Sequence, residues 1–172
     1  MNDLPIRKKV RLKDYDYSQP GCYFITLCVN DKKNILGDII DGQLSLSEYG
    51  KTVKMEIENI STIRKECIID KYVVMPNHIH MIAQIVGDDG NRPAIKHVPN
   101  QKRRADRHLP LRRTLSNMIQ GLKGAITRRL GISIWQRSFH DHIIRNEAQY
   151  LHIWQYIDQN PQRWSEDRYY TE

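Results

Sequence analysis

The 172-residue chain is predicted to fold as one α+β domain, residues 1–172, built on a ferredoxin-like (split βαβ) antiparallel sheet. Helices pack on one face of that sheet, and a C-terminal helix that carries Tyr156 lies across it. Two observations predict this class. The chain is long enough to bury one core, and nothing in it requires a second domain. Its predicted elements follow the order strand, hairpin, helix, strand, strand, helix, strand, helix.

The first elements are a strand and a hairpin that follow a polar, basic arm, residues 1–20. The side chains of Cys22–Val29 alternate in character well enough, from one residue to the next, to predict a strand. Asp41-Gly42, a dipeptide that favours a two-residue turn, separates Ile35–Ile40 from Gln43–Leu46. A small hairpin is therefore expected here.

A helix over 48–60 follows, because Ser47 is a suitable N-cap and apolar side chains recur at helical spacing. These side chains are Tyr49, Val53, Ile57 and Ile60. Two strands come next, at about 66–75 and 78–86. A turn at Pro76-Asn77 joins them.

The second half begins with a basic loop, residues 88–112, which shows no consistent period. An apolar stripe then predicts a helix from about 113 to 130, with Lys123 and Arg128 off the stripe and Gly131 just after its end. The stripe consists of Leu115, Met118, Leu122 and Ile126.

The last predicted elements are a strand over Ile134–Ile144 and a helix over 147–160. Asn146, with Gln149 three residues later, is suited to cap this helix. The helix must end before Pro161, which disfavours helical geometry in the residue that precedes it.

The composition indicates a reduced, cytoplasmic protein. Cys22, Cys28 and Cys67 are odd in number and lack metal-type spacing, and the first two share a strand face as packing residues. The first thirty residues lack a basic start followed by an apolar stretch, and no segment approaches the roughly 20 apolar residues that span a bilayer. We expect no membrane partner.

The positive charge is concentrated in residues 91–130, which contain eleven Lys or Arg and one acid. That segment is +10 in a chain of net charge +7, so the remainder carries about −3. A basic block on a mildly acidic body is typical of a protein with a polyanionic partner. The alternative interpretation is a solvated loop.

Two pairs of side chains suggest chemistry. His78 and His80 flank Ile79 on a predicted strand, so both imidazoles lie on one face and can share an ion. Tyr156 and Asn160 lie four residues apart on a predicted helix and are neighbours on one stripe. A metal beside a tyrosine nucleophile is a chemistry of phosphodiesters. Taken alone, each pair is more often structural, because such histidines often only hydrogen-bond and helix tyrosines mostly pack.

Four ordered segments carry a family resemblance: Tyr72-Val73-Val74-Met75-Pro76-Asn77-His78-Ile79-His80, Trp135-Gln136-Arg137, His142-Ile143-Ile144-Arg145-Asn146-Glu147 and Tyr156-Ile157-Asp158-Gln159-Asn160-Pro161. In this order they resemble the single-tyrosine HUH transposases of the IS200-like kind, and in particular the REP-associated tyrosine transposases. Arg11-Leu12-Lys13-Asp14-Tyr15-Asp16-Tyr17 and Tyr23-Phe24-Ile25-Thr26 are similar to that group as well. The resemblance covers roughly residues 11–165.

The resemblance implies an enzyme that cuts and rejoins single-stranded DNA, often beside a small hairpin, through a 5′-phosphotyrosine linkage and a free 3′-hydroxyl. It implies that His78 and His80 bind the metal, that Tyr156 is the nucleophile, and that Asn160 completes the metal site through its amide oxygen. It places His142 outside the metal shell.

These residue types suit a catalytic divalent ion. Two imidazoles and an amide leave coordination positions open, and without thiolates they favour weakly held Mg²⁺ or Mn²⁺. Tyr156 has an ordinary pKa of about 10, so at neutral pH the ion, a base or a water must help to remove its proton. The sequence does not identify that base. No nucleotide cofactor is needed, because the phosphotyrosine bond retains the energy of the broken diester.

The sequence also offers a second His-x-His pattern, His140-Asp141-His142, which we interpret as lining the DNA groove or orienting neighbours. Trp154 is expected to pack, whereas Trp135 and Trp164 are candidates for packing or for base stacking. The candidate DNA contacts are Lys102, Arg103, Arg104, Arg112, Arg113, Lys123, Arg137, His142 and Arg145.

The leading hypothesis is a metal-dependent transposase or strand transferase that acts on single-stranded or hairpin-bearing DNA. One alternative is a hairpin-binding protein, for DNA or RNA, that descends from such an enzyme. Another is a hydrolytic nuclease, which would form no covalent adduct. A homodimer and a monomer both stay open, because the IS200-like enzymes commonly act as dimers and their REP-associated relatives can act as monomers.

Overall fold

A four-stranded antiparallel sheet forms the centre of the protein, whose computed structural model describes residues 20–64, 67–86 and 115–171. The strand order is β4-β5-β1-β6. The strands are β1 (Gly21–Cys28), β4 (Cys67–Val74), β5 (His78–Ile85) and β6 (His140–Ile144). The predicted basic loop, residues 88–112, and all of the predicted arm except Pro20 lie outside the described residues.

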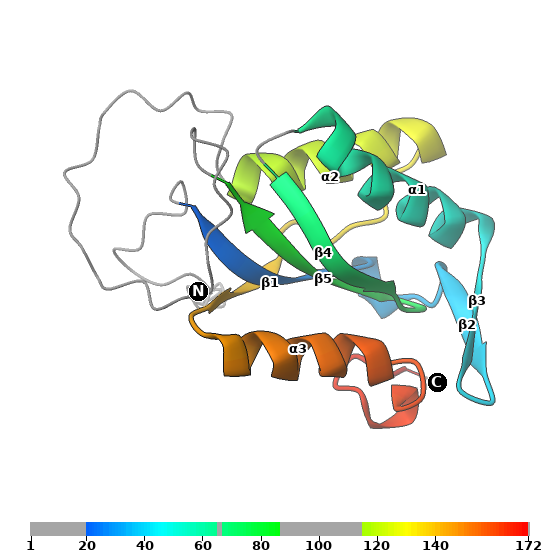
Figure 1. Cartoon of the computed structure of the whole chain (residues 1–172). Helices are drawn as coiled ribbons and strands as arrows, with labels where there is room; N and C mark the ends of the chain where they lie inside the picture. Colours follow the sequence, from blue (N-terminus) through cyan, green and yellow to red (C-terminus); the bar gives the residue numbers. More distant parts are fainter. Residues whose placement is uncertain (1–19, 65–66, 87–114, 172) are drawn as a thin grey trace, which may run out of the picture.

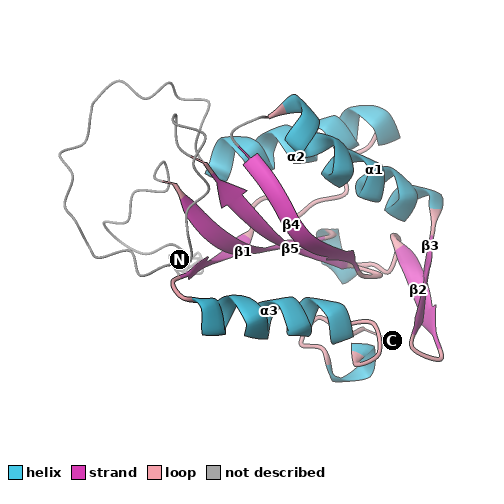
Figure 2. Cartoon of the chain, in the orientation of Figure 1, coloured by secondary structure: helices cyan, strands magenta, loops and turns pink. Residues whose placement is uncertain are grey.

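The sheet is covered on both faces, as Figures 1 and 2 show. Helices α1 (Glu48–Ile63) and α2 (Leu115–Leu130) pack on one face, and α3 (Glu147–Gln159) lies alone on the other. This arrangement confirms the predicted α+β class.

Alternation along the strands divides the apolar side chains between two cores. The larger core lies between the sheet and the helices α1 and α2, and includes Tyr23, Ile25, Leu27, Ile79, Met81, Leu115 and Ile126. The smaller core lies under α3 and consists of Cys22, Ile82, Ile144, Ile153 and Ile157, with Trp154 packed against it. The prediction that Trp154 packs is confirmed, and it is the α3 face that also carries the histidines of β5.

The predicted helix caps form as the sequence indicated. The Ser47 hydroxyl accepts from the Gly50 N–H at 3.1 Å and begins α1. At α3, Oδ1 of Asn146 accepts from the Gln149 N–H at 2.9 Å, while Oε1 of Gln149 accepts from the Arg145 N–H at 3.0 Å. Reciprocal bonds of this kind satisfy backbone donors that the helix itself leaves unpaired.

The predicted hairpin is also present, as β2 (Gly37–Ile40) and β3 (Gln43–Leu46). Its two turn residues, Asp41 and Gly42, have φ values of 51° and 73°. Two successive residues at positive φ match the twist of antiparallel strands, which explains the preference for this dipeptide. Gly131 likewise ends α2 at φ 72°.

The prediction of a continuous strand over Ile134–Ile144 is wrong for its first half, since β6 begins only at His140. Trp135 makes an isolated bridge to Val29. The carbonyl oxygens of Gln136 and Ser138 instead accept hydrogen bonds from the ammonium of Lys123, at 2.7 and 2.9 Å. A helix side chain therefore replaces the strand partner that these groups would otherwise need.

The three cysteines, Cys22, Cys28 and Cys67, are buried, and no disulfide joins any two of them. Tyr49 is 38% exposed, so the apolar face of α1 begins at Val53 rather than at Tyr49.

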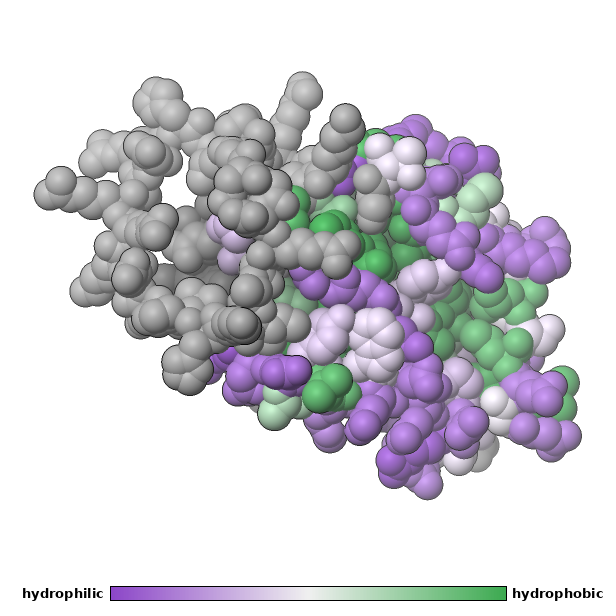
Figure 3. All heavy atoms as spheres, in the orientation of Figure 1, coloured by the Kyte–Doolittle hydropathy of each residue, from purple (hydrophilic) through white to green (hydrophobic). Residues whose placement is uncertain are grey.

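In the described ranges, none of the helices combines the length and the apolar character that a membrane span requires. Hydrophilic residues predominate at the bottom of the view in Figure 3, where α3 and the chain end lie.

Candidate active site

The two histidines of β5 lie side by side on the α3 face of the sheet. His78 and His80 are 0% and 1% exposed, and their ring centroids are 4.5 Å apart. Thr26 on β1 stands opposite His80 in the ladder, and its hydroxyl lies 2.8 Å from Nδ1 of that ring. A central strand therefore brings both imidazoles together beneath the last helix, as their spacing predicted.

Helix α3 brings Tyr156 and Asn160 to the same place. The Tyr156 hydroxyl oxygen lies 3.2 Å from Nε2 of His80, and the Tyr156 side chain is 37% exposed. Asn160 is buried at the C-cap of α3, one turn after Tyr156. The predicted helical stripe is thus directed at the histidine pair, and the four predicted site residues lie together within one protomer.

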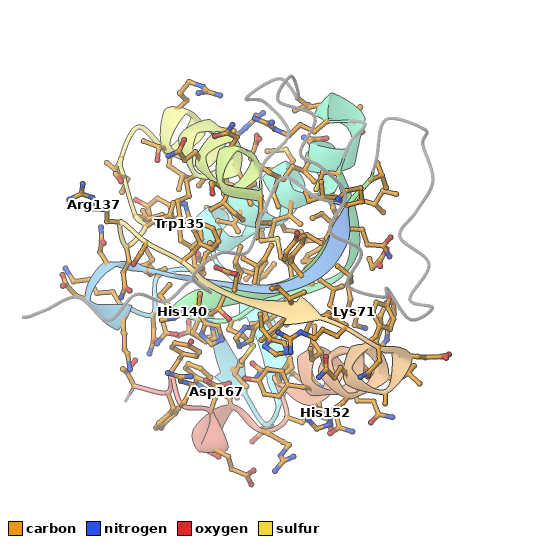
Figure 4. The ribbon with its side chains drawn as sticks, turned by 90° about the vertical axis from the view of Figure 1, so that its left-hand side faces the viewer. Lys71, Trp135, Arg137, His140, His152 and Asp167 are labelled. Carbon is orange, nitrogen blue, oxygen red and sulfur yellow. The ribbon has the colours of Figure 1, made fainter. Side chains whose placement is uncertain are left out.

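The structure adds a carboxylate that sequence reasoning missed. Oδ2 of Asp167 accepts from the Tyr156 hydroxyl at 3.0 Å and from Nδ2 of Asn160 at 2.8 Å. Ligand atoms of His78, His80 and Asp167 all lie within 4.8 Å of one another. In Figure 4, Asp167 appears on the α3 side of the sheet, in the segment that follows that helix.

No local signal identifies Asp167 in the sequence. It lies in a polar stretch with several charges, Glu166-Asp167-Arg168, whose composition is typical of a solvated segment at the protein surface. The short helix η3 (Trp164–Glu166) turns the chain back towards the sheet and places this side chain beside α3. Only the three-dimensional path of residues 161–171, the C-terminal segment, distinguishes Asp167 from its neighbours.

Burial sets the protonation of this cluster. It lowers the pKa of His78, and it holds the pKa of His80 well below the ordinary range, with the neighbouring His78 adding to the effect. Both rings are therefore neutral at pH 7 and present lone pairs to an ion. Burial also raises the pKa of Tyr156, and the charge of Asp167 and its hydrogen bond raise it further.

Two buried polar atoms of the cluster have no hydrogen-bond partner among the described residues: Nε2 of His78 and Oδ1 of Asn160. An unsatisfied buried acceptor is costly unless something binds it. Imidazole nitrogens and amide and carboxylate oxygens form a mixed donor set that suits a first-row divalent ion. The residues present therefore fit the metal that the sequence resemblance implies.

Aromatic rings of the C-terminal segment cover the histidines. The Tyr169 ring centroid lies 4.7 Å from that of His78, and the Trp164 centroid lies 5.9 Å from it. Trp164 is buried in this contact, and Trp135 is buried in the larger core. Beside them, a pocket of about 160 Å³ is lined by Tyr156, Gln159, Asn160, Arg163, Glu166 and Asp167.

The predicted DNA contacts separate into three groups. Arg137, His142 and Arg145 are exposed on or beside β6, and Arg137 points away from the body in Figure 4. Lys123 is instead engaged with backbone carbonyls, and burial lowers its pKa to about 8. The remaining candidates, Lys102, Arg103, Arg104, Arg112 and Arg113, lie outside the described residues.

Comparisons with known proteins give a consistent result. An uncharacterized protein of Haemophilus influenzae is 35% identical over 174 aligned residues, which cover 96% of this chain and 94% of the relative. Another H. influenzae protein, assigned to the REP-associated tyrosine transposases, is 27% identical over 150 residues, covering 85% of this chain and 73% of the relative. No family model matches the chain.

A solved structure shows the same fold. It is that of a REP-associated tyrosine transposase bound to a REP hairpin, with a TM-score of 0.61 and 21% sequence identity. The match covers 92% of this chain and 76% of the other.

Proposed function

Because this chain resembles a REP-associated tyrosine transposase in sequence and shares the fold of another, we propose that it cleaves and rejoins single-stranded or hairpin-bearing DNA. In this proposal Tyr156 is the nucleophile, and the enzyme is a single-tyrosine HUH transposase. The observation that supports it most is the short distance, 3.2 Å, between the Tyr156 hydroxyl and Nε2 of His80, a histidine of a buried pair.

The proposed covalent step is a transfer of one phosphodiester. The Tyr156 oxygen loses its proton and attacks the phosphorus, the bond from phosphorus to the 3′ oxygen breaks, and the departing 3′ oxygen takes up a proton to become a 3′-hydroxyl. The 5′ phosphate stays on the tyrosine, so a 3′-hydroxyl can later attack that phosphorus and restore both the diester and the phenol. The exchange conserves the number of phosphoester bonds, and no nucleotide is consumed.

Four side chains would hold the metal: His78 and His80 through Nε2, Asn160 through Oδ1 and Asp167 through its carboxylate. When bound, Mg²⁺ or Mn²⁺ would act as a Lewis acid on the scissile phosphate. Asp167 has a second role in the proposal, because its Oδ2 accepts from the Tyr156 hydroxyl. That bond holds the phenolic proton on the side of Asp167 and leaves a lone pair of the oxygen for attack.

The phosphate backbone of the DNA would be bound by basic residues. Arg137 and Arg145 flank the exposed strand β6, and the +10 segment from residue 91 to 130 supplies further charge. Contacts of this kind provide affinity without base specificity, and they weaken as salt rises. The target sequence would then be determined by the hairpin and its flanks.

A covalent adduct tests the proposal. Wild-type protein, Mn²⁺ and a labelled single-stranded oligonucleotide that carries a palindrome from beside the gene should give a shifted protein–DNA band on a denaturing gel. Tyr156→Phe should remove that band while DNA affinity and thermal stability stay unchanged, because it deletes one oxygen and keeps the ring. Tyr150→Phe is a matched control on the same helix, since its hydroxyl contacts Asp70 instead.

The other outcomes distinguish the alternatives. Cleavage of the oligonucleotide without any adduct would identify a hydrolytic nuclease. Tight binding of the hairpin with no cleavage in Mn²⁺ or Mg²⁺ would identify a hairpin-binding protein. An adduct that survives in Tyr156→Phe would assign the nucleophile to another residue.

A further inference from the structure

We propose that Asn77 is a positioning residue, which fixes the orientation and the tautomer of His78 and fastens the C-terminal segment to the metal-binding strand. This inference rests on the proposed function of the histidine pair. Asn77 is fully buried in the turn between β4 and β5, immediately before His78. Asn is common in turns, where its side chain usually bonds to nearby backbone groups, whereas the buried side chain of Asn77 also bonds to distant parts of the chain.

The donor side of the Asn77 amide faces acceptors from two distant parts of the chain. Its Nδ2 lies 2.9 Å from the carbonyl oxygen of Tyr169, 3.2 Å from that of Lys32 and 3.1 Å from Oγ1 of Thr171. The opposite orientation of the amide would set its oxygen against two backbone carbonyl oxygens. The surroundings therefore allow only one orientation of this group.

The acceptor side of the same amide then determines the proton on His78. Oδ1 of Asn77 lies 2.9 Å from Nδ1 of His78, and a carbonyl oxygen can only accept. The proton of the neutral ring must therefore be on Nδ1. Nε2 keeps its lone pair, and Nε2 is the buried atom of this ring that has no hydrogen-bond partner among the described residues.

His80 provides an internal comparison. Its Nδ1 contacts the Thr26 hydroxyl and its Nε2 contacts the Tyr156 hydroxyl, and a hydroxyl group can donate or accept. Of the two rings, His78 is the one whose partner is an amide oxygen, which can only accept. An outer partner of this kind orients a metal ligand and raises its basicity.

The donor side of Asn77 also connects the histidine to the rest of the site. Tyr169, whose carbonyl it binds, covers the His78 ring at 4.7 Å and donates its own N–H to Oδ1 of Asp167 at 2.7 Å. Asp167 in turn accepts from Tyr156 and Asn160. One buried amide thus positions a proposed ligand on β5 and the segment that carries Asp167.

The tautomer can be read directly, without metal or DNA. Long-range ¹H–¹⁵N spectra of the metal-free protein near pH 7 should show the proton of His78 on Nδ1 in the wild type. In Asn77→Leu the Nδ1–H tautomer should lose its dominance. In Asn77→Asp it should persist, because a carboxylate oxygen still accepts. In that variant, however, the amide of Tyr169 should exchange with solvent faster, because the donors that hold the segment are lost.

Metal affinity supplies a second readout. Removing an outer partner of a metal ligand typically weakens binding by about 10–100-fold, and we expect a loss in this range for Mn²⁺ in Asn77→Leu. Thr171→Val is the matched control, because it removes one contact of the segment and leaves the bond to His78 in place. We expect its Mn²⁺ affinity to stay within about threefold of the wild type, well below that loss.

The result that overturns this inference is a wild-type spectrum with the His78 proton on Nε2, or an unchanged spectrum in Asn77→Leu. If Asn77→Leu fails to fold, Asn77→Asp provides the test instead. A His78 proton on Nε2 in that variant would also overturn the inference. These outcomes are independent of the proposed function. A protein that forms no DNA adduct can still carry the predicted tautomer, and an active transferase can lack it.

Discussion

The chain contains two His-x-His patterns, and the structure gives them opposite environments. His78 and His80 are buried on β5, a central strand, whereas His140 and His142 are exposed on β6 at the edge of the sheet. Both pairs lie on the same face, because Thr26 stands opposite His80 on one side and opposite His140 on the other. The spacing of two histidines therefore does not decide their role.

The surroundings of each pair account for the difference. The β5 pair lies beneath Tyr156 and the C-terminal segment, which place the oxygen atoms of Tyr156 and Asp167 beside it. The β6 pair is exposed to solvent, and His140 reaches only the edge of this cover, with its ring centroid 6.4 Å from that of Tyr169. Over the described part of the chain, the β5 pair with Asp167 is the group whose ligand atoms converge closely enough for one ion.

The largest expected effect separates the two pairs by function. His78→Ala or His80→Ala should remove Mn²⁺ binding and DNA cleavage together, by about 100-fold or more, because a lost ligand forfeits several kcal/mol of charge stabilisation. His140→Ala should leave Mn²⁺ binding largely intact. Calorimetric titration with Mn²⁺ and a cleavage assay measure both. Equal losses in all three variants would contradict the distinction.

An intermediate effect concerns stability and pH. Burial lowers the pKa of His78 and His80 below 6.5, so below that pH the unfolded chain takes up protons that the folded protein refuses. The free energy of unfolding of the metal-free protein should therefore fall on acidification from pH 7 to pH 5, by up to ~1.4 kcal/mol per pH unit for each such histidine.

Urea unfolding at a series of pH values measures this slope. His80→Gln should reduce it, because one buried titrating group is removed. His140→Gln, which replaces an exposed ring, is the control and should retain the wild-type slope. A slope that does not change in His80→Gln would show that other groups cause the acid sensitivity.

The smallest expected effect concerns the exposed edge beside the second pair. Replacing Arg137 and Arg145 with Ala should weaken binding of single-stranded DNA to all sequences alike. The slope of log affinity against log salt should become shallower by about 0.7 for each lost phosphate contact. Mn²⁺ binding should not change. Replacing Lys102, Arg103 and Arg104 in the same assay tests the basic loop.

An unchanged salt slope in either set of variants would exclude that set from the DNA interface. A loss of Mn²⁺ affinity in Arg137→Ala or Arg145→Ala would show that the exposed edge at β6 is coupled to the buried histidine pair on β5, which would contradict the separation of the two.

The sequence predicts the elements and their order well because local chemistry determines them. Ser47, Asp41-Gly42 and Asn146 act through backbone groups only a few residues away, and their predicted roles are confirmed. The predicted strand is interrupted after its bridge at Trp135, where the ammonium of Lys123 on α2 binds the carbonyl oxygens of Gln136 and Ser138, a nonlocal contact.

The candidate site also divides into residues that the sequence identifies and residues that depend on nonlocal contacts. A periodic signal or a family motif marks four of the site residues, so the sequence alone identifies them as candidates: His78, His80, Tyr156 and Asn160. Asp167 and the two-sided contacts of Asn77 depend on how residues 161–171 return to the sheet. No spacing within the sequence encodes that path, and a charged residue near a chain end resembles a solvated one until the fold is known.

The most direct test of the central claim is the position of the ion. Crystals of the protein soaked in Mn²⁺ should show an anomalous peak bounded by Nε2 of His78, Nε2 of His80, Oδ1 of Asn160 and the carboxylate of Asp167, next to the Tyr156 hydroxyl. A peak between His140 and His142 instead, with the β5 pair still hydrogen-bonded to protein groups alone, would contradict the account.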